Sequence, residues 1–397
     1  MSMEGNTDSA WATRRSAMHP QLALHVFVAM LNMFTMGYDL CVMSSIFRDV
    51  SVGLRPHGFK NCHTDATCYD ELLLISTAVI GAAVAGPISG ILCGHFGRRG
   101  VMFGTSSLFV VGGIFLATAH EHSIALFYIG RLLEGFAIGG GGTAAYTLVS
   151  EVSPVSIRGT LLSCGEVSLA LGCLLASLVT YGQGGAALVT EWRTSLWVGV
   201  APAALQFILL FTTCESPRWL LEHGQVDAAQ RAAHRLRLDL DEIQNSRLLV
   251  QEPIAQGGSC STVQTHRWQL ARVVLFTFAC SLTFGNSIQF NGRTIWEELG
   301  SKEPLLDNVY ESLVKLAGAA FVAPFADKLG RRPVLIFGTL FTILPMVVMS
   351  ISGYLHDFTG SLVGLLIVIF AWDGAWGNLV FAVASEITPQ PVADQAD

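Results

Sequence analysis

Two ionisable side chains, Asp39 and Arg131, stand inside long apolar stretches of this 397-residue chain. A charge at the centre of a hydrocarbon layer costs roughly 2.5 to 3.5 kcal/mol on insertion scales, so each of these side chains needs a partner or a function. We expect the two to pair with each other. A static ion pair between two helices is the purely structural interpretation.

Glu166 and Lys315 are two further charges in apolar stretches. Glu311 stands one turn before Lys315, a spacing at which two side chains can pair on one helix face. In the alternative interpretation, Glu166 and Lys315 face a central cavity and bind a zwitterionic or charged cargo.

The remaining motifs indicate neither catalysis nor a cofactor. Gly139 to Gly142 lack the Lys-Ser/Thr pair that follows in a phosphate-binding loop, so glycines that let helices approach closely are the better interpretation. The histidines show no metal-ligand spacing, and no nucleophile stands with a base. We expect no enzyme activity, no metal, no cofactor and no nucleic-acid partner.

The composition predicts an all-α membrane protein. Hydrophobic residues make up 51% of the chain and charged residues only 13%, against about 25% charged in soluble domains. A membrane barrel would instead show short alternating segments. Apolar runs of about 20 residues, the length that crosses a bilayer, predict about ten helices, at Leu22–Ile46, Leu72–Cys93, Val101–His120, Ile124–Val149, Leu161–Tyr181, Ser195–Cys214, Trp268–Phe290, Tyr310–Phe325, Val334–Leu355 and Leu362–Ala384.

The loop cations predict the orientation of these helices. Placing the N-terminus in the cytosol puts most of the Lys and Arg residues on the cytosolic side, as the positive-inside rule requires. The first apolar run is expected to act as a signal anchor, with the plasma membrane favoured over an internal membrane. Cys62 and Cys68, in the first outside loop, could form a disulfide in an oxidising compartment.

Two motifs occur twice, with a period of about 235 residues. Gly97-Arg98-Arg99 returns as Gly330-Arg331-Arg332, and Ser150-Glu151 returns as Ser385-Glu386. The chain is therefore predicted to be a tandem duplication with a substrate site between its halves. The expected divisions are a cytosolic tail at 1–21, a six-helix half at 22–214, a cytosolic loop with a short helix at 215–267 and a half of about four helices at 268–397.

An ordered set of motifs resembles the major facilitator superfamily, and most closely its sugar-porter branch. The resemblance implies twelve helices in two pseudo-repeats. About ten of them are predicted here, so the C-terminal half is expected to be incomplete, through a truncated gene model, a splice form or a decayed copy. The matching motifs are Gly37-Tyr38-Asp39, Gly97-Arg98-Arg99, Gly130-Arg131, Tyr146 through Ser150-Glu151, Pro154 to Arg158-Gly159, Glu215 to Leu220, and Asp327 through Arg332-Pro333.

The resemblance also implies roles for individual residues. Asp39 would load a proton and Arg131 would tune it. Glu166 stands where sugar porters typically carry a glutamine. The implied substrate-binding residues are Glu166, Asn286, Gln289, Phe290, Lys315, Trp376 and Phe381. The implied cytosolic gate consists of Arg98, Glu151, Arg158, Asp327, Arg331, Arg332 and Glu386.

We therefore predict a secondary active transporter that works by alternating access and is coupled to protons. A sugar or polyol is the favoured solute. An organic-ion or aromatic-acid transporter of the same superfamily is the first alternative, and a non-transporting sensor or a truncated inactive copy is the second.

Overall fold

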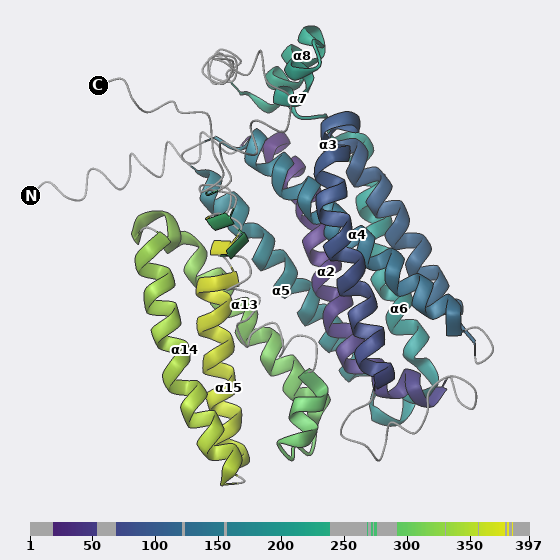
Figure 1. Ribbon diagram of the computed structural model, residues 1–397, viewed down its shortest axis with the longest axis vertical. Coiled ribbons are helices and arrows are strands. Elements are labelled where there is room, and N and C mark those ends of the chain that lie inside the picture. The colour runs from purple at the N-terminus through teal and green to yellow at the C-terminus, as the bar shows by residue number, and fades with distance from the viewer. Residues whose placement is uncertain are drawn as a thin grey trace, which may run out of the picture.

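The computed structural model describes residues 19–53, 69–120, 124–154, 157–238, 292–329, 331–355 and 357–377, with scattered positions at 268–275 and 379–383. Regular structure in this part of the chain is helical, as predicted. Figure 1 shows two groups of helices lying side by side, with α13 (Pro304–Leu329) of the second group against α5 (Arg158–Gln183) of the first.

The first helical group consists of α2 (Pro20–Gly53), α3 (Tyr69–Thr118), α4 (Ile124–Val152), α5 and α6 (Gly185–Leu209). α3 is two helices joined at Gly97, whose φ of 81° and ψ of 164° are not helical. The two apolar runs predicted within α3 therefore lie on either side of this turn.

Glycines set the close packing of this group. A Cβ built on Gly37 of α2 would meet the backbone of Leu169 on α5, and one built on Gly172 of α5 would meet the backbone of Phe34 on α2. Gly139 of α4 lies equally close to α3, as expected for the glycine run. Small residues allow such backbone approach where lipid offers no hydrophobic driving force between helices.

One end of the first group carries η2 (Leu210–Thr212), α7 (Pro217–Glu222) and α8 (Val226–Leu236). Ser216 caps α7 by accepting a hydrogen bond from the Trp219 backbone N–H at 3.4 Å. α8 buries an apolar face that includes Leu236, so this segment holds a short amphipathic helix. We call this end the α7/α8 end; α2 runs from it to the opposite end.

The second helical group consists of a helical segment at 292–298, α13, α14 (Arg331–Tyr354), α15 (Phe358–Trp372) and the π-helical turn η4 (Asp373–Gly377). Predicted runs are found in α13, α14 and α15, whereas the run Trp268–Phe290 lies mostly outside the described residues. The domain divisions at 214 and 267 stay predictions.

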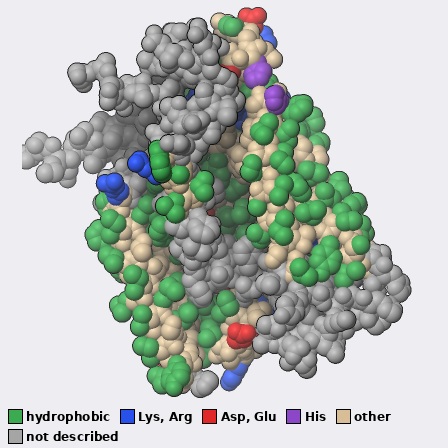
Figure 2. Space-filling model, in the orientation of Figure 1, with side chains coloured by type: hydrophobic (Ala, Val, Ile, Leu, Met, Phe, Trp, Pro, Cys, Tyr) green, Lys and Arg blue, Asp and Glu red, His purple; other side chains and the backbone are tan. Residues whose placement is uncertain are grey.

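Seven of the described helices are long and apolar enough to cross a membrane. This is three fewer than the ten predicted, because α3 holds two predicted runs, because α13 carries Asp307, Glu311 and Lys315, and because the run Trp268–Phe290 lies mostly outside the described residues. α14 is the most outward-facing of the seven, with only 6% of its apolar window buried. Figure 2 shows hydrophobic side chains over both groups, with most charged side chains near the two ends. This is the surface expected for contact with lipid.

Candidate functional site

The predicted pair of Asp39 and Arg131 is present at the centre of the first group. Arg131 Nη1 lies 2.5 Å from Asp39 Oδ1, and both side chains are at most 3% exposed. The same nitrogen lies 3.0 Å from Glu134 Oε2. Glu134 was not singled out from the sequence, although its i,i+3 spacing from Arg131 was a usable signal. We call Asp39, Arg131 and Glu134 the buried triad.

Hydrogen bonds and small residues position the buried triad. Tyr38, next to Asp39, donates its hydroxyl proton to the Ser195 carbonyl at 2.7 Å, which joins α2 to α6. On the α3 side, a Cβ built on Gly112 would lie 3.0 Å from Glu134 Cγ. A larger residue at 112 would therefore displace the Glu134 side chain.

A second charged cluster lies where the two helical groups meet. Lys315 Nζ of α13 lies 3.8 Å from Asp373 Oδ1 of η4, and both side chains are at most 3% exposed. Glu166 of α5 is buried beside them, since a Cβ built on Gly377 of η4 would lie 3.0 Å from its carboxyl carbon. Asp373 was not predicted. We call Glu166, Lys315 and Asp373 the central cluster.

The local pair considered for Lys315 and Glu311 is not the arrangement found among the described side chains. Glu311 instead accepts a hydrogen bond from Trp296 Nε1 at 3.2 Å, and Lys315 has its ionic contact with Asp373 on η4. The interpretation in which Lys315 and Glu166 face the interior between the groups agrees with these contacts.

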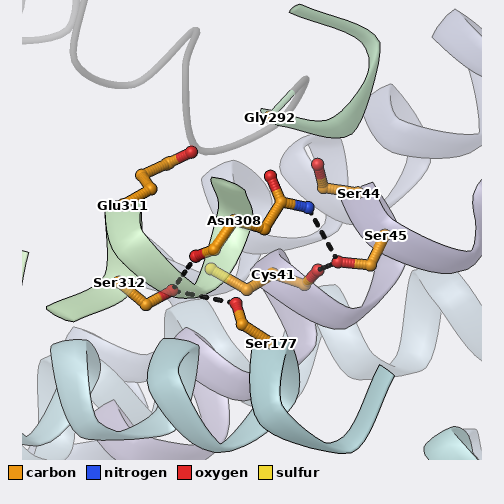
Figure 3. A pocket seen from close by; sticks show the side chains of 8 residues that line it. All are labelled: Cys41, Ser44, Ser45, Ser177, Gly292, Asn308, Glu311 and Ser312. Carbon is orange, nitrogen blue, oxygen red and sulfur yellow. Dashed lines mark hydrogen bonds between the residues drawn. The ribbon is translucent and has the colours of Figure 1, made fainter. Parts of the chain in front are cut away.

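A small polar cavity adjoins this region, between α2, α5, α13 and the 292–298 segment (Figure 3). Ser177 of α5 and Ser312 of α13 share a hydrogen bond of 2.9 Å across the groups, and Asn308 Nδ2 donates to Ser45 Oγ of α2 at 3.3 Å. The lining residues are Cys41, Ser44, Ser45, Ser177, Gly292, Asn308, Glu311 and Ser312.

Arg293 joins the two groups beyond this cavity, at the end opposite α7 and α8. Its Nη1 lies 2.5 Å from Asp49 Oδ2 and donates to the Ser45 carbonyl at 2.7 Å, both on α2. Its Nε lies 3.0 Å from Glu297 in its own helical segment. This contact could not be predicted from the sequence, because nothing in the spacing of Asp49 and Arg293 links them.

At the α7/α8 end, Arg98 Nη2 lies 2.6 Å from Glu151 Oε1, which joins α3 to α4. Glu215 accepts hydrogen bonds of 3.0 Å from the backbone N–H groups of both Arg98 and Arg99, and its carboxylate lies against Gly97. Arg158 donates to the Ser153 carbonyl at 3.3 Å. Glu215 is thus a further member of this charged group that was not predicted.

Trp376 and Arg332 are the other predicted residues whose side chains are described. Trp376 Nε1 donates to Thr339 Oγ1 of α14 at 3.0 Å, so its polar edge is turned towards α14. Arg332 is exposed at the start of α14. The side chains of Asp327 and Arg331 lie outside the described part, as do the residues Asn286, Gln289, Phe290, Phe381, Glu386, Cys62 and Cys68.

The family described as "Sugar (and other) transporter" matches the chain over residues 25–396. The chain belongs to this transporter family. It is therefore a multi-pass membrane transporter and not an enzyme. Within the described residues of this sugar-transporter-family protein, no group of three or more His, Cys, Asp and Glu side chains could hold a metal ion.

Two relatives in the sugar-transporter family match along most of the chain. The glucose transporter GlcP of Staphylococcus epidermidis is 28% identical over 329 residues, which cover 80% of this chain and 72% of the relative. The arabinose-proton symporter of Bacillus subtilis is 27% identical over 380 residues, which cover 91% and 78%.

Among solved structures, the partially occluded inward open conformation of the xylose transporter XylE from E. coli aligns with a TM-score of 0.79 at 21% identity, over 94% of this chain and 87% of that chain. The fold of this family member is therefore the major facilitator superfamily fold, as the motifs predicted.

Proposed function

We propose that this protein is a proton-coupled secondary transporter of a small polar solute, with a sugar or polyol as the first candidate. The buried pair of Asp39 and Arg131 is the observation that carries the proposal. A proton that binds Asp39 removes the charge that holds Arg131, so protonation changes how α2 and α4 are held together. A relative, the arabinose-proton symporter, is named for the same coupling.

Two sets of contacts support an alternating-access mechanism. Arg293 holds the groups together at the end opposite α7 and α8, while Arg98 and Glu151 belong to the gate proposed at the α7/α8 end. The side chains of both pairs are 6 to 14% exposed, and a hydrogen bond to a charged group contributes about 1.5 to 3 kcal/mol, so either end can open at a cost of a few kcal/mol. The proposed gate also includes Arg158, Asp327, Arg331, Arg332 and Glu386.

We place the α7/α8 end and the N-terminus in the cytosol and the protein in the plasma membrane. The support is the positive-inside rule, because the arginines at Arg98, Arg99, Arg218 and Arg235 lie at or near the α7/α8 end. Protease protection of tags inserted after Gly224 and in the loop that follows Gly53 would test this orientation. A tag at Gly224 that is cleaved from outside intact cells would refute it.

The transport proposal is tested with purified protein in lipid vesicles. Uptake of labelled hexose, inositol and an organic acid is measured at two external pH values, for the wild type, for Asp39→Asn and for Glu191→Gln. Glu191 is an exposed acid on α6 and serves as the control. We expect faster wild-type uptake at the lower external pH, the same pH response in Glu191→Gln, and none in Asp39→Asn. Wild-type uptake at the same rate at both pH values, or a wild-type pH response in Asp39→Asn, would refute proton coupling.

The central cluster favours a second candidate, the transport of an organic ion. Glu166, Lys315 and Asp373 are all buried where the helical groups meet, and ionisable groups inside a membrane bundle typically mark a substrate or ion path. Glu166→Gln decides between the candidates. If Glu166→Gln keeps sugar uptake and loses organic-ion uptake, Glu166 binds an ionised cargo. If the variant loses sugar uptake and organic-ion uptake is unchanged, the cargo is neutral.

A further inference from the structure

Glu134 takes no part in the coupling proposed between Asp39 and Arg131, yet it shares their site. It lies 3.0 Å from Arg131 Nη1, the nitrogen that also binds Asp39 at 2.5 Å. Because both acids are bonded to one nitrogen, their bound oxygens are no more than 5.5 Å apart. All three side chains are at most 4% exposed.

The buried triad has one more acid than base. α3 presents Gly112 and Gly113 to Glu134, with Val200 of α6 beside them, and α2 contributes Asp39. Among the described side chains in contact with Glu134, Arg131 is thus the only cation. Two ionised carboxylates would leave one uncompensated negative charge in this site, and such a charge is costly away from water. One bound proton restores neutrality.

The hydrogen bonds leave a place for that proton. Asp39 Oδ2 is buried and accepts no hydrogen bond from the described residues. A carboxylic acid on Glu134, or a proton on Asp39 itself, would supply the donor that this oxygen lacks. Neighbouring carboxyl groups commonly share one proton in this way, because they cannot both ionise at low cost.

We propose that Glu134 is a second acid of the coupling site, which shares one proton with Asp39 and becomes the partner of Arg131 when Asp39 is protonated. The inference rests on the proposed coupling at Asp39. In the step, a hydronium ion gives its proton to a carboxylate oxygen, so that one of its O–H bonds breaks as the carboxyl O–H bond forms, and release to water reverses this exchange. Arg131 keeps an ionised carboxylate throughout, so the proton binds without leaving a buried cation alone.

The pH response of uptake tests this role, and the direction of the change follows from the charges. In Glu134→Gln, protonation of Asp39 leaves Arg131 without a carboxylate. Proton binding is then weaker, and the pH of half-maximal uptake should fall by about one unit, a tenfold loss of proton affinity. Glu134→Asp should keep the wild-type direction of response, and Glu191→Gln should match the wild type. A wild-type pH profile in Glu134→Gln would overturn the proposal.

Infrared spectroscopy of the purified protein tests the shared proton without transport. At neutral pH the wild type should absorb as protonated carboxylic acid, and subtracting the spectrum of Glu134→Gln or of Asp39→Asn from it should leave one carbonyl band, because either variant leaves one acid and one base in the buried triad. The central cluster, with Glu166 and Asp373 against Lys315, is unchanged in both variants, so any band of its own cancels in the difference. A Glu134→Gln difference spectrum without this band would refute the shared proton. If wild-type uptake ignores pH, the coupling proposal fails by itself and the infrared result still decides whether the proton is shared.

Discussion

Replacing Asp49 with asparagine is expected to weaken the contact that closes the end opposite α7 and α8. Arg293 makes two bonds to α2, one of 2.5 Å to the Asp49 carboxylate and one of 2.7 Å to the Ser45 carbonyl. Its third bond, to Glu297, stays within its own helical segment. Asparagine keeps the size of aspartate and removes the charge, so the change acts mainly on one of the two bonds that cross between the groups.

The size of the effect follows from the burial of the pair. The Asp49 side chain is 6% exposed and that of Arg293 is 14% exposed, so solvent screens the pair only in part. A hydrogen bond to a charged group contributes about 1.5 to 3 kcal/mol, and a neutral one about 0.5 to 1.5 kcal/mol. The difference, about 1 to 1.5 kcal/mol, corresponds to roughly a tenfold change in the ratio of closed to open protein at this end.

The native thiol of Cys41 reports this opening, because Cys41 lines the small cavity between the groups (Figure 3). Its rate of modification by a maleimide that cannot cross the membrane is measured by peptide mass spectrometry. We expect roughly a tenfold faster reaction in Asp49→Asn, in line with the population shift.

The matched control is Glu222→Gln, which removes an exposed pair with Arg218 inside α7 at the other end. It should leave the Cys41 rate unchanged. Equal rates in Asp49→Asn and the wild type would show that the Arg293 contact does not hold this end closed, and an equal acceleration in Glu222→Gln would show a general loosening of the protein.

Three further changes are expected to lower stability, measured as thermal denaturation in detergent. Tyr38→Phe removes the buried donor to the Ser195 carbonyl and should cost about 1 kcal/mol; an unchanged Tm would mean that another donor serves this carbonyl. Gly97→Ala places a side chain at a φ of 81° and should cost at least about 1 kcal/mol. Lys315→Met should cost about 3 kcal/mol or more, and adding Asp373→Asn should recover part of it. A double variant less stable than the single one would contradict this pairing.

Much of the fold could be predicted because each apolar run has the length of a membrane crossing and carries its own helical signal. The pair of Asp39 and Arg131 followed from the cost of burying either charge alone. Glu134 was accessible to the same reasoning, since it stands one turn from Arg131 on a helix that was correctly predicted. It is not required by charge alone, because one carboxylate already balances the arginine.

The partners of Lys315 and Gly97 could not be predicted from spacing. Asp373 still follows the register of α15, since its backbone N–H bonds to the Ile369 carbonyl, but the period of one helix does not tell which residue of another helix lies opposite, and Lys315 is on α13. Glu215 reaches Gly97 from the irregular stretch between η2 and α7, where no periodicity exists. Both contacts depend on tertiary packing between distant parts of the chain.

The two sides of α5 differ in how easily they can slide. Towards α2, Gly172 brings backbone against backbone, and any displacement along the helix axis would drive the chains into each other. Towards α13, Ser177 meets Ser312 through hydroxyl groups, which can each take a water molecule as a new partner. Farther along the same side, Glu166 lies beside the buried charges of Lys315 and Asp373. Movement between the halves should therefore be easy at the serine pair and limited at the central cluster, while α2 and α5 travel together.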